Sequence, residues 1–214
     1  MTMLRKYFRW AVYLVLALGF SLARAGSYED FFEAVARNDG PAINALLQRG
    51  FDVNSRDPKG QTGLFLALRA GAFNAAEALS NGPGLDVNAL NEVGESALMM
   101  AALKGHVDWC KRLLDRGAQV NKSGWTPLHY AATGASTDAV KLLLERGAVV
   151  DADSPNRSTP LMMAARYGSE ASVDVLLARG ADPRRVNDQK LKAADFARLA
   201  GRQSLAAQLD KLAQ

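Results

Sequence analysis

The sequence is poor in the residues that build disulfides and metal sites. It has one cysteine, Cys110, and two histidines, His106 and His129, among 214 residues. A single thiol cannot form an intramolecular disulfide, so in an oxidising compartment the fold must be stabilised by packing alone. No Cys/His cluster, phosphate-cradling glycine loop or nucleophile motif is present. We therefore expect no metal, no cofactor and no enzyme activity.

Outside its first residues the chain also lacks a basic excess. Of its 26 basic residues, four lie within residues 1–25, which contain no Asp or Glu; residues 26–214 carry 22 basic and 22 acidic residues. Phosphate binding requires a basic face on the folded part of a protein. The charge balance therefore predicts no nucleic-acid partner.

Residues 1–25 have the pattern of a secretory signal peptide. Basic residues precede an apolar run over residues 10–23, and the small residues Ala23 and Ala25 suit a signal-peptidase site before Gly26. The run of about 14 residues is shorter than the roughly 20 needed to cross a bilayer. We predict export with cleavage, so that the chain meets the membrane only transiently through its signal. The alternative is an uncleaved anchor that holds the protein to the inner membrane, facing the periplasm.

The rest of the sequence repeats with a period of about 33 residues. Similar segments begin at Thr62, Ser96, Thr126 and Thr159, spaced 34, 30 and 33 residues apart. Glycines that follow an arginine recur at Gly50, Gly117, Gly147 and Gly180. Val-Asn or Val-Asp pairs recur at Val53-Asn54, Val87-Asn88, Val120-Asn121 and Val150-Asp151, and the first, third and fourth pairs each begin three residues after one of these glycines. A fixed period of this length predicts a solenoid, in which each unit packs only on its neighbours.

The repeated segments carry the motif of a known family. Thr-Pro-Leu-His is intact at residues 126–129, and Thr-Pro-Leu recurs at residues 159–161. The chain resembles the ankyrin-repeat family over essentially all of residues 26–214. The resemblance implies an all-α solenoid of helix-turn-helix units joined by β-hairpin-like fingers, with about four to six repeats including caps. The approximate repeats are 27–56, 57–90, 91–122, 123–153, 154–186 and, as the C-terminal cap, 187–214.

Local chemistry agrees with this resemblance and also predicts departures from it. Threonine or serine can cap the first helix of a unit, and glycine can end the second helix in a left-handed conformation. Residues 80–85 interrupt the second repeat, so its second helix is expected to end early. The finger before Thr126 is three residues shorter than the others. Residues 28–54 and 187–214 are interpreted as the solubilising caps of the solenoid.

The resemblance implies a protein that binds another protein in the groove between its fingers and first helices. We expect a monomeric, non-catalytic scaffold in the periplasm; this location rests on family analogy. The variable positions expected to face the groove are Lys59, Gln61, Arg69, Glu92, Glu95, Leu103, Lys104, Trp125, Asn156, Ser158, Arg166 and Tyr167. Trp125 is the main candidate hot spot, with packing against His129 and Tyr130 as its alternative.

Two other functions stay open at this stage. The chain can be an immunity or protective partner of one exported enzyme, which sequence cannot distinguish from a general scaffold. In a different class, His106 and Cys110 are four residues apart, a spacing that allows a thiol, metal or redox centre. However, Cys110 takes the apolar position that Val140 and Val173 fill in later repeats, and buried thiols are generally inert.

Overall fold

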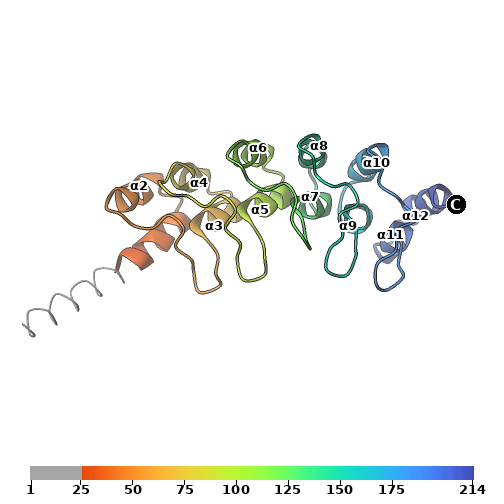
Figure 1. The fold of residues 1–214 in the computed structure, drawn as a ribbon, viewed down its shortest axis with the longest axis horizontal. Helices are drawn as coiled ribbons and strands as arrows, with labels where there is room; N and C mark the ends of the chain where they lie inside the picture. The colour runs from red at the N-terminus through yellow and green to blue at the C-terminus, as the bar shows by residue number, and fades with distance from the viewer. Residues whose placement is uncertain (1–25) are drawn as a thin grey trace, which may run out of the picture.

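The computed structural model describes residues 26–214, which form six helix pairs arranged in two rows (Figure 1). The inner row consists of residues 26–36, α3 (Gly63–Ala70), α5 (Ala97–Lys104), α7 (Pro127–Thr133), α9 (Pro160–Tyr167) and α11 (Ala193–Leu199). The outer row consists of α2 (Gly40–Gln48), α4 (Phe73–Ser80), α6 (Val107–Asp115), α8 (Thr137–Glu145), α10 (Glu170–Ala178) and α12 (Gln203–Leu212). The predicted signal peptide lies outside the described residues, so its cleavage stays a prediction.

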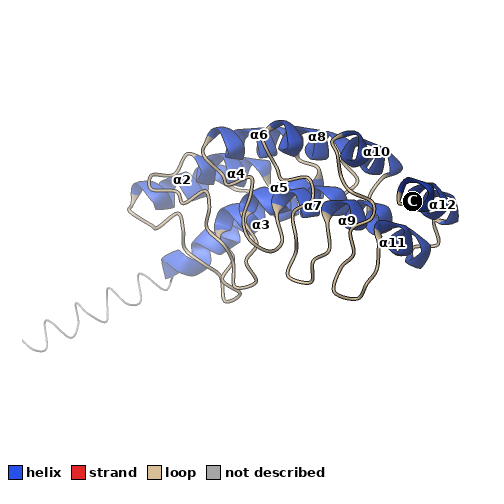
Figure 2. Ribbon diagram, turned by 45° about the vertical axis from the view of Figure 1, so that its right-hand side comes forward, coloured by secondary structure: helices blue, strands red, loops and turns tan. Residues whose placement is uncertain are grey.

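The predicted all-α solenoid is confirmed. In residues 26–214 the only β pairing is two isolated antiparallel bridges, Arg56 with Thr62 and Leu90 with Ser96, at the bases of two fingers. Within the same residues no helix has the length and apolar character needed to span a membrane. The rows run side by side, with the fingers projecting from the inner row (Figure 2).

The helix ends follow the chemistry of the sequence. The hydroxyls of Thr62, Ser96, Thr126 and Thr159 each accept a hydrogen bond from the backbone N–H three residues later. After the outer helices, the expected glycines are left-handed, with φ of 85° at Gly50 and Gly147, 87° at Gly117 and 88° at Gly180. Helix α4 has eight residues where α2, α6, α8 and α10 have nine, so its predicted early end is confirmed.

Small residues let neighbouring inner helices approach closely. The alanine pairs of α5, α7 and α9 are fully buried, and α5 packs on α7 and α7 on α9. A Cβ added to Gly168, at the end of α9, would lie 2.2 Å from the carbonyl oxygen of Ala132 in α7. That distance is far below van der Waals contact, so the inner row requires glycine there for space, although its φ of −87° is ordinary.

The fingers are fixed by side chains that bond their own backbone. Asp57, Asn91 and Asn187 each accept hydrogen bonds from the N–H groups two and four residues later, and Ser154 accepts one from Ser158. Such turns give the loop an ordered shape without a sheet. The short finger before α7 has no room for this turn; there the Lys122 ammonium donates to the carbonyls of Ser123 and Trp125 instead.

Candidate partner-binding surface

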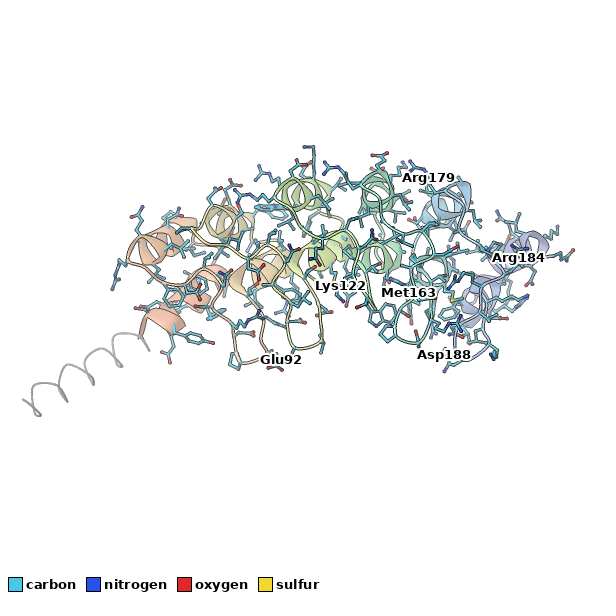
Figure 3. All side chains as sticks on the ribbon, viewed as in Figure 1. Glu92, Lys122, Met163, Arg179, Arg184 and Asp188 are labelled. Atoms are coloured by element: carbon cyan, nitrogen blue, oxygen red, sulfur yellow. The ribbon has the colours of Figure 1, made fainter. Side chains whose placement is uncertain are left out.

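The inner helices and the fingers form one continuous side of the solenoid. Figure 3 shows Glu92 and Asp188 on two of the fingers, on the opposite side of the molecule from Arg179 at the end of α10. Because successive repeats contribute a finger and an inner helix, this side offers an extended surface on which one partner could lie.

At its N-terminal end this surface holds an apolar pocket of about 430 Å³. Tyr28 and Phe32 pack ring on ring at 4.9 Å, and Leu66 of α3 and Pro58 of the adjoining finger complete the wall. Charged groups line its edge, among them the exposed Arg69. The pocket can therefore accept an apolar side chain whose flanks carry polar groups.

Sequence reasoning missed this pocket because it treated residues 28–54 as a cap. Phe31 and Val35 do close the end of the core, with Phe31 stacked on Phe51 at 4.6 Å. Phe32 lies on the other side of the same helix and stays half-buried. The signal was present, since Tyr28 and Phe32 are four residues apart and so share a helix face.

The predicted groove residues fall into two groups. Those at finger tips or near the ends of inner helices are exposed or half-buried: Lys59, Arg69, Glu92, Leu103, Lys104, Asn156, Arg166 and Tyr167. Those directly before a helix cap are covered to different degrees: Gln61, Glu95, Trp125 and Ser158. The role of the exposed group in binding stays a prediction.

Gln61 and Ser158 are corrections to the predicted surface, because both side chains are buried. Gln61 accepts a hydrogen bond from Arg69 at 3.1 Å, and the Ser158 hydroxyl accepts one from Asn187 of the next finger at 3.4 Å. At the same position Glu95 accepts from the Tyr130 hydroxyl of the next repeat at 2.7 Å. The residue before each cap therefore binds neighbouring parts of the solenoid rather than facing an open groove.

Trp125 and Tyr167 also differ in how much of the side chain is exposed. Trp125 is half-buried and packs edge-on against His129, with ring centroids 5.2 Å apart. Packing against His129, which was the predicted alternative to partner binding, therefore accounts for the buried part of Trp125. Tyr167 is 56% exposed and is covered on one face by the Arg166 guanidinium, 5.1 Å from the ring centre. Tyr167 is the more accessible aromatic anchor of the two.

The surroundings of Cys110 and His129 disfavour chemistry at either group. Cys110 is fully buried, and burial raises the pKa of its thiol to about 12. His129 is also fully buried: its Nε2 donates to the Ser158 carbonyl and its Nδ1 accepts from the Thr126 N–H. Burial lowers the His129 pKa to about 4, so the ring is neutral and structural at pH 7. No group of three metal-binding side chains occurs in residues 26–214.

Comparison with known proteins supports a binding role. Residues 31–123 and 116–187 match the family model described as ankyrin repeats in three copies. The Notch protein of Drosophila melanogaster is 34% identical over 150 residues, which are 61% of this chain and 6% of that protein. Notch homolog protein 1 of Danio rerio is 34% identical over 164 residues, 68% of this chain and 7% of that protein. The chain thus spans under a tenth of the length of these relatives.

Among solved structures, one similar chain belongs to the complex of the predatory endopeptidase Bd0816 from Bdellovibrio bacteriovorus with the immunity protein Bd3460. That chain is 27% identical, has a TM-score of 0.72, and the similarity covers 85% of the present chain and 97% of the other. The likeness therefore extends over the whole solenoid of the other protein, not over a single repeat.

Proposed function

We propose that this chain, which belongs to the ankyrin-repeat family, is an immunity protein that binds one exported peptidase and blocks it without catalysing a reaction. The peptidase would lie on the side formed by the inner helices and the fingers, which we call the concave surface. Ankyrin repeats bind other proteins, so the general activity follows from the family. The single observation that carries the finer proposal is the end-to-end similarity to a chain of a peptidase–immunity complex.

Geometry is consistent with a stable partner rather than a small substrate. The binding side is extended, and its defined pocket is apolar and suits one protruding side chain of a partner. Strong protein interfaces combine such an anchor with a polar surround. The Cys110 thiol is fully buried and burial raises its pKa to about 12, so it is not a nucleophile within reach of a substrate, although His106 beside it is only half-buried.

The proposed location follows from residues 1–25. Cleavage of the predicted signal before Gly26 would deliver residues 26–214 to the periplasm, where an exported peptidase of the same cell also folds. An immunity protein is useful there because the enzyme would otherwise attack periplasmic substrates of its own cell.

The test begins with residues 26–214 as bait in a periplasmic extract of the source organism, followed by reconstitution of any captured peptidase from purified components. We expect a stoichiometric complex in which hydrolysis of the peptidase substrate is abolished. Tyr167→Ala should weaken the complex by about 30-fold, the effect of removing a typical hot spot. Lys141→Ala, on outer helix α8, is the matched surface control and should leave affinity unchanged.

Trp125→Ala separates binding from packing. A loss of affinity with an unchanged melting temperature would place Trp125 in the interface, whereas a lower melting temperature with full affinity would make it part of the scaffold. A captured peptidase that stays active when saturated with this protein, or an extract that yields no peptidase, contradicts the proposed function.

A further inference from the structure

One outer helix carries a tryptophan where the other outer helices carry a small residue. Trp109 is the third residue of α6, and the third residues of α4, α8 and α10 are Ala75, Ala139 and Ser172. All four side chains are buried. Helix α6 packs on α8, and α2 on α4, whereas α4 and α6 lie further apart, as do α10 and α12. At the α4–α6 boundary the Trp109 ring faces Phe73 of α4, with the ring centroids 6.4 Å apart.

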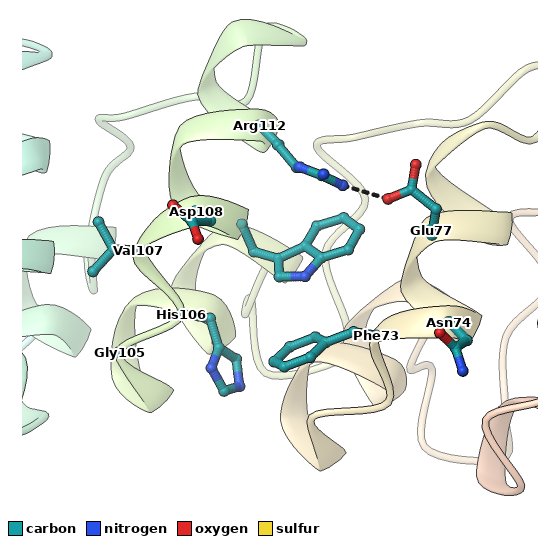
Figure 4. Close-up of a pocket in the computed structure, with 9 residues that line it drawn as sticks. Phe73, Asn74, Glu77, Gly105, His106, Val107, Asp108 and Arg112 are labelled. Carbon is teal, nitrogen blue, oxygen red and sulfur yellow. Dashed lines mark hydrogen bonds and ion pairs between the residues drawn. The ribbon is translucent and has the colours of Figure 1, made fainter.

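The separation leaves a cavity of about 580 Å³ between the first turns of α4 and α6 (Figure 4). Trp109 lines this cavity, and the Arg112 guanidinium carbon lies over its ring, 5.0 Å from the ring centre. The same guanidinium pairs with the Glu77 carboxylate of α4. The protein itself thus places an arginine between an aromatic face and a carboxylate.

The cavity offers a second ring and a second carboxylate without a second guanidinium. Phe73, 43% exposed, lies roughly parallel to Trp109 at 6.4 Å. Asp108 lines the same cavity, is exposed, and has no hydrogen bond or ion pair within residues 26–214. Glu77 is paired with Arg112 and is also close to Arg116, and Lys104 acts on His106, so the feature that distinguishes this cavity is the unpaired Asp108 carboxylate.

His106 also lines the cavity and adds no positive charge to it. Burial lowers its pKa, so the ring is neutral at pH 7. The ring bonds to the Leu68 carbonyl, which requires an N–H donor, while Nε2 is buried without a partner. The Phe73 and His106 rings pack edge to face, with their centroids 4.9 Å apart.

We propose that this cavity binds an arginine side chain of a partner protein, with the guanidinium stacked on Phe73 and paired with Asp108. Guanidinium is planar and weakly hydrated, so it stacks on aromatic rings more readily than an ammonium does. The site lies between outer helices, away from the concave surface. It does not rest on the proposed function, and a partner could occupy it while the concave surface is also filled.

The test uses Trp109 as its own reporter. In residues 26–214 the tryptophans are Trp109 and Trp125, so the variant Trp125→Phe leaves a single emitter beside the cavity. Nα-acetylarginine amide should change its fluorescence saturably, with a dissociation constant in the millimolar range expected for one stacked ion pair. Nα-acetylcitrulline amide has nearly the same shape without the charge and should bind at least tenfold more weakly.

Variants then assign the contacts. Asp108→Asn and Phe73→Leu should each weaken arginine binding at least fivefold. The matched control is Asp138→Asn, since Asp138 is the second residue of α8 as Asp108 is of α6, but pairs with Lys141 and lines no such cavity. Melting curves verify that each variant folds, and the indole N–H resonance of Trp109 in the otherwise unchanged chain gives a second readout.

Three results would overturn the proposal: no saturable response to the arginine amide, equal responses to the arginine and citrulline amides, or unchanged binding after Asp108→Asn. Because the assay contains no peptidase, its outcome is independent of the test of the proposed function.

Discussion

Replacing Asp151 by asparagine should stabilise the solenoid, because Asp151 stands where other repeats use an asparagine clamp. The side-chain amides of Asn54, Asn88 and Asn121 donate to the carbonyls of a glycine in the next repeat, at 2.8, 3.1 and 2.8 Å. The same side chains accept from a backbone N–H two residues after that glycine, at 2.8 to 2.9 Å. Each asparagine thus satisfies one donor and one acceptor across a repeat boundary.

Asp151 performs half of this task. Its carboxylate accepts from the Asp182 N–H at 3.1 Å but has no proton to donate to the carbonyl of Gly180, the glycine equivalent to those of the other clamps. Burial raises the Asp151 pKa; the hydrogen bond from the Asp182 N–H and the charge of Arg185 oppose this shift, and the carboxylates of Asp182 and Asp153 add to it. Asp151→Asn supplies the missing donor, so we expect a gain of about 1 kcal/mol, the net value of one internal hydrogen bond.

The pH dependence of the gain identifies its cause. A carboxyl with a raised native pKa contributes stability that is fully present below its ordinary value of 3.8 and is lost as pH rises through the native pKa. The advantage of Asp151→Asn, measured from urea midpoints with the slope held common, should therefore be largest near pH 7 and shrink toward about pH 3. The control Asp153→Asn removes an exposed ion pair with Arg185 and should change stability by less than about 0.5 kcal/mol. A variant no more stable than the parent at pH 7, or a gain independent of pH, would refute the clamp argument.

Three further outcomes are expected. His129 has a native pKa lowered from 6.5 to about 4, so the stability that its neutral ring contributes is present above pH 6.5 and is lost as the pH falls through 4. At about 1.4 kcal/mol per pKa unit, this stability amounts to about 3 kcal/mol. His129→Met copies Met162 at the same helix position, and it should remove this pH dependence of the unfolding free energy from urea titrations. Gly147→Val should cost about 1 to 3 kcal/mol of unfolding free energy through left-handed backbone strain alone, since no atom lies within 4 Å of the added Cβ, and an unchanged melting temperature would contradict this. Cys110 should react with a thiol reagent only as fast as the protein unfolds, and rapid labelling of the folded protein would restore the thiol-centred alternative.

The features predictable from sequence were those that one repeat determines by itself. A threonine cap or a left-handed glycine acts over three or four residues, and the same local chemistry recurs in each unit, so the period and the caps were sufficient to place the helices. The early end of α4 was visible for the same reason, since residues 80–85 break the pattern within their own unit.

Exposure at the surface depends on two repeats together, and this is where the prediction was wrong. Gln61 and Ser158 hold positions that look variable within a unit, yet each is covered by groups from elsewhere in the solenoid or from its own inner helix. Spacing along the chain contains no direct information on how closely one finger stacks on the next. A better rule for this solenoid is that the residue directly before a cap contacts the scaffold, while residues two or three places earlier reach solvent.

The cavity beside Trp109 shows why a repeat architecture tolerates such a local change. In a globular core, exchanging an alanine for a tryptophan displaces neighbours on all sides and is strongly destabilising. In a solenoid each unit contacts only the two beside it, so the outer helices α4 and α6 can separate while α5 stays packed on α3 and α7 in the inner row. The space between α4 and α6 is lined by whatever side chains these two helices present there. A change at such a boundary leaves the inner row and the fingers in place, which allows the two surfaces of one solenoid to acquire partners independently.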